Sequence, residues 1–185
     1  MQTDLLEGLI YYTRLEAPTG DLICVAADEA AIVRIATGLG EEQLRAEAAG
    51  RWGAKCVRRP AHAPLREATR QLEEYFAGRR LEFQLPLKLC GTPFQLRVWQ
   101  ALERIPYGTT CSYQQLARTI GRPKAARAVG AANRANPVAI VIPCHRVIQA
   151  DGRLGGYGGG RRLKQFLLEL EKRVSAARPP GPSVR

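Results

Sequence analysis

A cysteine and a histidine stand next to each other in the second half of the chain, and these two residue types can carry out nucleophilic chemistry. Cys144 and His145 follow Pro143, directly after the apolar residues 138–142. A cysteine attacks as its thiolate, which a base or cationic surroundings can generate. His145 could be that base, and Arg146 adds positive charge.

Such a site also needs a third group that holds the base in place. The second half of the chain has four acidic residues, and Glu169 and Glu171 are both candidates. Adjacency along the chain does not establish contact, because neighbouring side chains often point apart. The alternative interpretation is therefore a buried structural cysteine beside a surface histidine.

The five cysteines do not form an obvious disulfide framework or metal site. Their number is odd and no pair has C-x-x-C spacing, so we expect reduced thiols. Zinc takes about four N or S ligands. Cys24, Cys56 and His62 are conceivable ligands with sparse spacing, and we expect neither a metal nor another cofactor. The Gly-rich residues 152–160 lack the G-K-[ST] of a nucleotide-binding loop.

Basic charge is concentrated in the second half of the chain. Residues 1–90 contain 12 basic and 13 acidic residues, whereas residues 91–185 contain 16 and 4. Between residues 104 and 162 there are ten basic residues and one acid, Asp151. A block of one sign favours a polyanionic partner, most often nucleic acid. The alternative is a basic surface that reflects an arginine-rich composition.

The first half predicts a small α/β unit that spans residues 1–88. The turn signal Pro18–Asp21 separates two strand-like runs, and Gly50 is expected to end the first helix. We expect strands at 9–13, 22–26, 31–35 and 81–85, helices at 41–49 and 64–76, and a linker at 86–92.

The second half predicts a mostly helical unit. Ser112 and Gln115 have the spacing of a capping box, and Pro123 suits the first position of a following helix. Two helices joined by a short turn at Gly121 indicate a helix-turn-helix. We expect helices at 93–104, 112–120, 123–133 and 162–171, a buried strand at 138–142, and a disordered tail at 175–185.

The helix expected at 123–133 is rich in small side chains, which let a backbone approach another surface closely. Its small residues are Ala125, Ala126, Ala128 and Gly130. Two basic residues, Lys124 and Arg127, lie within it, and Arg134 follows its last residue. Tight packing in a core is the alternative, but arginines on a small-residue face favour a DNA groove.

Several segments together resemble the O6-alkylguanine-DNA alkyltransferases, also called methylated-DNA–protein-cysteine methyltransferases. The similarity is close over about residues 92–172, and the N-terminal part matches only in layout. It rests on Ile142-Pro143-Cys144-His145-Arg146-Val147-Ile148, Ser112–Ala117, Pro123–Gly130 and Asn133–Pro137. The resemblance implies an N-terminal ribonuclease-H-like domain (1–88) and a C-terminal alkyltransferase domain (92–172), an α+β fold overall.

The resemblance also implies roles in the reaction. Cys144 would accept the alkyl group, His145 would deprotonate it through a water, and Glu171 would orient His145. Asn136 would hold the active-site turn. The substrate-binding residues would be Tyr113, Tyr157, Gly158, Gly159 and Val147.

For DNA, the resemblance implies minor-groove binding by the helix that bears Ala125, Ala126, Ala128 and Gly130. Arg127 would enter the base stack and fill the space of a flipped guanine, and Tyr113 would crowd the target phosphate. Lys124 and Arg134 are further candidate DNA-binding residues because of their charge. A base inside a duplex must leave the stack to reach a pocketed thiol.

The expected function is therefore DNA repair by irreversible, single-turnover transfer of an alkyl group from guanine O6 to Cys144, with thymine O4 as a further candidate position. The alternatives are a catalytically silent lesion sensor and a Cys-His hydrolase. We expect double-stranded DNA as the partner, a monomer when free, and a cytoplasmic location. No apolar run approaches the roughly 20 residues of a membrane span, and residues 1–4 do not resemble a secretory signal.

Overall fold

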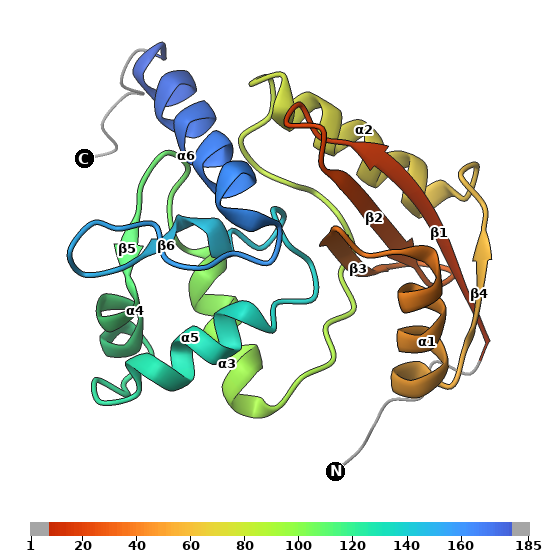
Figure 1. The fold of residues 1–185 in the computed structure, drawn as a ribbon, viewed down its shortest axis with the longest axis horizontal. Helices are drawn as coiled ribbons and strands as arrows, with labels where there is room; N and C mark the ends of the chain where they lie inside the picture. Colours follow the sequence, from red (N-terminus) through yellow and green to blue (C-terminus); the bar gives the residue numbers. More distant parts are fainter. Residues whose placement is uncertain (1–7, 179–185) are drawn as a thin grey trace.

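The computed structural model describes residues 8–178 and has a sheet domain beside a helical domain (Figure 1). The predicted α+β fold class is confirmed. The elements run in the order β1 (Leu9–Glu16), β2 (Leu22–Ala27), β3 (Ile32–Thr37), α1 (Glu41–Trp52), β4 (Lys55–Arg58), α2 (Ala63–Phe76), α3 (Pro93–Glu103), β5 (Cys111–Ser112), α4 (Tyr113–Thr119), α5 (Ala126–Arg134), the 3-10 turn η1 (Cys144–Arg146), β6 (Val147–Ile148) and α6 (Gly160–Ala176).

The main sheet has the strand order β3-β2-β1-β4, in which only the β1–β4 pair is parallel. Side chains alternate between the two faces because a strand has a period of two residues. Tyr12 therefore packs with α1 on one face, and Tyr11 belongs to the core on the other face.

The two faces of the sheet have separate cores. The helix α1 buries Leu44 and Trp52 against one face. The helix α2 buries Leu72 against the other face, and this second core continues into the helical domain through Trp99 and Leu167. The sheet domain and the helical domain thus share one hydrophobic core.

Two segments that are distant in sequence, at Pro86 and at Pro137–Ala139, form backbone hydrogen bonds with the edge strand β3. The Ile32 amide donates to the Pro86 carbonyl at 2.8 Å. Further along, the Ile35 amide donates to the Pro137 carbonyl at 2.9 Å, and the Ala139 amide donates to the Ile35 carbonyl at 3.0 Å. Backbone hydrogen bonds therefore join the sheet to the loop that precedes Cys144.

The predicted capping box at the start of α4 is confirmed. The Gln115 amide donates to Ser112 Oγ at 3.1 Å, and the Ser112 amide donates to Gln115 Oε1 at 2.6 Å. This exchange satisfies two amides that the first helical turn leaves free. It fixes where α4 begins, and hence where Tyr113 lies.

Two sequence predictions in the first half need correction, and one strand was missed. The helix expected at 41–49 continues through Gly50 to Trp52 and ends at Gly53, whose φ of 63° is left-handed. The strand expected at 81–85 does not form, and the β-bridge to Ile32 lies at Leu87. The strand β4 was not predicted, because Cys56 is its single buried residue and gives no alternation.

Two predictions around the candidate chemistry are also wrong. The helix expected from Pro123 begins at Ala126, because residues 123 and 124 form a turn, so Lys124 precedes the helix and Ala125 is its N-cap. Residues 138–142 form a tight turn in place of a strand, with a bridge between Ala139 and Ile142. Ile140 in this turn has a φ of 74°, which a β-branched residue rarely adopts.

The last helix is longer than expected. It spans Gly160–Ala176, so residues 175 and 176 of the tail predicted as disordered are helical. Residues 179–185 of that tail lie outside the described residues, and the domain boundaries at 88 and 92 stay predictions. Within residues 8–178, no helix is long and apolar enough to cross a membrane.

The turn before β5 gives a test of how closely it packs against the C-terminal helix α6. Gly108 and Gly121 have left-handed φ values of 75° and 70°. A Cβ on Gly108 would lie 2.9 Å from Ser175 Cβ, whereas a Cβ on Gly121 meets nothing within 4 Å. Gly121→Ala should lower the free energy of unfolding by about 1–2 kcal/mol through its backbone alone. Gly108→Ala should cost about 1–3 kcal/mol more through overpacking. Urea unfolding of both variants measures the difference, and equal losses would contradict this account.

Candidate active site and nucleic-acid interface

Cys144 opens the short turn η1, and Asn136 shapes the loop in front of it. Asn136 Nδ2 donates to the Ile142 carbonyl at 2.8 Å, and Asn136 Oδ1 accepts from the Val138 amide at 3.0 Å. One side chain thus closes the loop that contains the left-handed Ile140. The arrangement agrees with the predicted position of Asn136 at the turn.

His145 lies against Glu171, and both side chains are fully buried. His145 Nε2 is 3.0 Å from Glu171 Oε1. A carboxylate only accepts, so Nε2 carries the imidazole proton and Nδ1 is left as the basic atom. Nδ1 has no hydrogen-bond partner in the described part of the chain. The alternative of a surface histidine is wrong, and so is Glu169 as orienting acid, because Glu169 is exposed and bonds Gln165.

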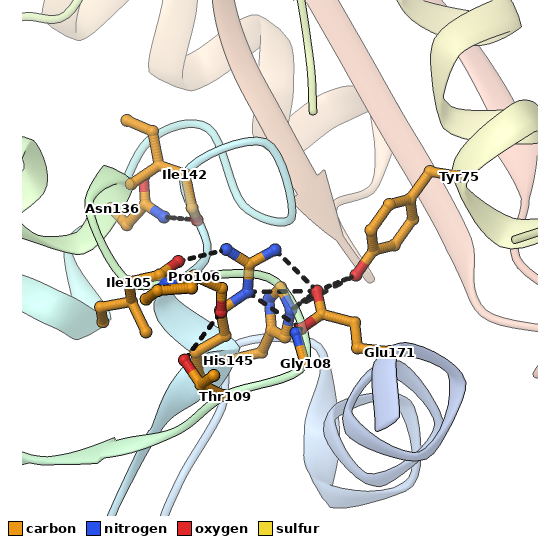
Figure 2. A network of polar contacts seen from close by, with 10 residues as sticks. Tyr75, Ile105, Pro106, Gly108, Thr109, Asn136, Ile142, His145 and Glu171 are labelled. Carbon is orange, nitrogen blue, oxygen red and sulfur yellow. Dashed lines mark hydrogen bonds and ion pairs between the residues drawn. The ribbon is translucent and has the colours of Figure 1, made fainter. Parts of the chain in front are cut away.

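Glu171 is the centre of a larger network, which Figure 2 shows. Arg146 donates to both carboxylate oxygens, with Nε 2.9 Å from Oε2 and Nη2 2.8 Å from Oε1. The Gly108 amide donates to Oε2 at 3.0 Å, and the Tyr75 hydroxyl donates to Oε1 at 2.6 Å. Burial raises the pKa of Glu171, but the bonds from His145 and Arg146 outweigh it and lower that pKa to about 2.

The Cys144 thiol and the His145 imidazole are both uncharged at neutral pH. Burial raises the pKa of the Cys144 thiol, against lowering contributions from Asn136 and the Lys164 charge. Burial also lowers the pKa of His145, against the raising effect of Glu171. A neutral imidazole within reach of a thiol, directly or through a water, can take its proton.

Lys164 is a buried cation that the sequence analysis did not identify. Its Nζ donates to the Val147 carbonyl at 2.6 Å and to the Leu154 carbonyl at 2.5 Å. Burial lowers the pKa of Lys164 to about 8, while the nearby Cys144 raises it. Val147, predicted to bind substrate, is fully buried, and its carbonyl is held by this lysine.

A small cavity of about 170 Å³ opens beside Cys144. Tyr157, Gly158 and Gly159 line it, as the sequence predicts for a substrate pocket, together with Asn133 and Arg134. Its opposite wall is unexpected, because it comes from the end of β3 and the residues after it: Arg34, Ile35, Ala36, Thr37, Gly38 and Leu39. The sheet domain therefore forms part of the candidate pocket.

A larger open groove of about 610 Å³ lies along α5. It brings together Tyr113, Arg127, Gly130 and Arg134 with Ala126. Arg134 borders both the groove and the cavity, so the two hollows adjoin.

Not every predicted DNA-binding residue lines this groove. Ala128 and Lys124 are exposed beside it, and Ala125 is half-buried at the start of α5. The two arginines in the groove lining, Arg127 and Arg134, suit a partner that carries phosphate.

The conceivable zinc ligands do not come together. Cys24 and Cys56 lie in the core under α1, whereas His62 packs on Tyr11 and its Nε2 lies 2.8 Å from the Asp28 carbonyl oxygen. Over residues 8–178, no three or more His, Cys, Asp or Glu side chains are grouped as metal ligands. The expectation of no cofactor stays a prediction.

Fold and site together define a class of protein in which a buried cysteine, backed by a His–Glu pair, faces a small cavity beside a basic groove. The family models identify the class further. Residues 93–173 match the 6-O-methylguanine DNA methyltransferase, DNA binding domain, and residues 10–89 match the ribonuclease-like domain of the same family. The chain belongs to the 6-O-methylguanine DNA methyltransferase family.

Individual relatives agree with this assignment. The chain is 44% identical over 162 residues to a methylated-DNA–protein-cysteine methyltransferase of Methanosarcina acetivorans, covering 88% of this chain and 98% of that one. It is 47% identical over 166 residues to the constitutive enzyme of that name from Bacillus subtilis, covering 88% and 95%. The crystal structure of Mycobacterium tuberculosis OGT in complex with DNA superposes with a TM-score of 0.78 at 43% identity, covering 89% and 94%.

The Glu171 network predicts how stability depends on pH. The pKa of Glu171 falls from 4.5 in a model peptide to about 2 in the fold. Its contribution, about 3 kcal/mol, is complete above pH 4.5 and is lost as pH falls towards 2. Urea unfolding of the wild type should therefore show a loss of stability through this window.

Two glutamate variants make this measurement specific. Glu171→Gln should already be less stable at pH 7, by about 3–5 kcal/mol, because Arg146 loses its buried counter-ion, and it should lose less on acidification. Exposed Glu169→Gln should keep the wild-type pH dependence. An unchanged acid response in Glu171→Gln would show that other groups cause it.

Proposed function

We propose that this protein repairs DNA as a methylated-DNA–[protein]-cysteine S-methyltransferase, by moving an alkyl group from guanine O6 to Cys144. The observation that carries the proposal is the buried cysteine that faces a cavity and has a His–Glu pair behind it, in a chain of this family. Relatives that carry the methyltransferase name, and one solved in complex with DNA, support the same activity.

The proposed reaction is a single displacement. Cys144 Sγ attacks the alkyl carbon, an S–C bond forms, and the C–O6 bond breaks with its electron pair going to guanine. The thiol proton passes to His145 Nδ1, through a water, and ends on the released guanine. The product is a thioether, which has no carbonyl for water to attack, so the cysteine is not regenerated and no cofactor is needed.

The base has to leave the duplex to reach this cavity. We propose that α5 lies in the minor groove, with Ala126, Ala128 and Gly130 allowing close approach. Arg127 enters the base stack at the place that the base has left. Tyr113, which lines the protein groove along α5, turns the nucleotide. Tyr157, Gly158 and Gly159 then enclose the flipped guanine.

The remaining parts of the proposal concern setting and partners. The protein acts as a monomer before it meets DNA, in the cytoplasm, and the net charge of residues 91–185 attracts the duplex. Lys124, in the turn before α5, and Arg134, its last residue, contribute phosphate contacts. Thymine O4 is a second candidate position for the alkyl group.

The decisive experiment is a titration of O6-methylguanine duplex against the protein, followed by intact and peptide mass spectrometry. We expect one methyl group per molecule, on Cys144, and no repair beyond equimolar lesion. Cys144→Ser should take up none, and Cys111→Ser should behave as wild type.

Other outcomes identify the alternatives. DNA binding without mass gain would indicate a lesion sensor, and turnover on esters or amides without DNA would indicate a hydrolase. Methyl label on another cysteine would reject the site.

A second prediction separates base extrusion from chemistry. Arg127→Ala should slow repair of duplex DNA far more than reaction with free O6-benzylguanine, because a free base needs no extrusion. The exposed Arg66→Ala, on α2, should alter neither rate. Equal losses on both substrates would place Arg127 in chemistry or folding instead.

A further inference from the structure

Tyr75 reaches the His–Glu pair from the other domain. It lies on α2 of the sheet domain, is fully buried, and donates its hydroxyl to Glu171 Oε1 at 2.6 Å. The Tyr75 hydroxyl oxygen is also 3.4 Å from His145 Nε2. Figure 2 shows its ring on the far side of the carboxylate from the turn at Gly108.

The direction of this hydrogen bond follows from chemistry. A carboxylate with a pKa of about 2 only accepts, so the tyrosine must donate. Burial and the Glu171 charge raise the pKa of Tyr75 well above 10, so its hydroxyl keeps its proton at any pH at which the protein works.

Glu171 Oε1 accepts hydrogen bonds from three residues, which share its negative charge. Arg146 Nη2 lies at 2.8 Å, Tyr75 Oη at 2.6 Å and His145 Nε2 at 3.0 Å. Arg146 binds both oxygens and fixes the plane of the carboxylate. Tyr75 contacts only Oε1, the oxygen that faces the imidazole, and is within reach of the imidazole itself.

We propose that Tyr75 is a positioning residue for alkyl transfer, which holds Glu171 Oε1 against His145 Nε2 so that Nδ1 is presented to Cys144. This inference rests on the proposed function. It also gives the sheet domain a part in the reaction, because α2 supplies a member of the hydrogen-bond network behind the acceptor cysteine.

Tyr75→Phe tests this with the smallest possible change. The ring packs against Phe83 at 5.3 Å and Tyr107 at 6.0 Å between centroids, and phenylalanine keeps both contacts. Tyr107→Phe is the matched control, because Tyr107 lies in the same cluster and its buried hydroxyl has no partner among residues 8–178. Thermal unfolding checks that both variants fold.

The first readout is the single-turnover rate with O6-benzylguanine, which reports chemistry without DNA binding. Tyr75→Phe should slow it roughly tenfold, because a positioned base contributes about 10²–10⁴-fold and only its orientation is loosened. DNA affinity should stay unchanged. Tyr107→Phe should react as wild type. A rate for Tyr75→Phe within twofold of wild type would overturn the proposal.

The second readout is the pH dependence of that rate, which a purely structural role would not move. The groups around His145 are Glu171 and Lys164 from α6, Arg146 from its own turn, Tyr75 from α2, and the Tyr157 ring at 6.4 Å between centroids, with Cys144 next to it in the chain. Of these, the variant changes only Tyr75. Without its donated hydrogen bond, more of the Glu171 charge acts on the imidazole, so the acid limb of the profile should move to higher pH.

The outcomes separate cleanly. A slower rate with an unmoved acid limb, or an equal effect of Tyr107→Phe, would reduce Tyr75 to a packing residue and overturn the proposal. If the wild type accepts no alkyl group from DNA or free base, the proposed function fails instead. In that case the His145 pKa, read by ¹⁵N NMR in a chain with two histidines, still decides whether Tyr75 acts on the imidazole.

Discussion

The structure depends on one buried negative charge. Glu171 is fully removed from water, and an isolated carboxylate there would be very costly. Its compensation comes from separate parts of the chain: Arg146 and His145 in η1, Gly108 in the turn after α3, and Tyr75 in α2. Only Tyr75 comes from the sheet domain, so the docking of the two domains completes the set of donors around this charge.

The same burial determines how the cysteine works. A thiol in a low-dielectric site holds its proton, so Cys144 is protected from indiscriminate reaction at rest. The next residue, His145, has an Nδ1 atom with no hydrogen-bond partner among residues 8–178, which leaves this nitrogen free to accept a proton. The loop that fixes Cys144 stores strain at Ile140, and the Asn136 hydrogen bonds hold it in place.

The sequence predicted what depends on short-range chemistry. The Ser112 capping box, the position of α2 and the adjacency of Cys144 and His145 are local features, and all appear in the structure. The strand expected at 138–142 was wrong because an apolar run can equally fill a buried turn. Tyr75 and Lys164 could not be identified from spacing, because their partners are 96 and 17 residues away and only tertiary packing brings them together.

The wall that β3 contributes to the cavity follows from the same docking. A Cβ on Gly159 would lie 2.3 Å from Thr37 Oγ1, so the loop after Tyr157 can approach the end of β3 only because residue 159 has no side chain. A Cβ on Gly158 meets nothing within 4 Å. The contact between Gly159 and Thr37 therefore determines one side of the cavity, whereas the space beside Gly158 is open. The sheet domain fixes the first side, and residue 158 is where a change of side chain alters the room for an alkyl group at the least cost to packing.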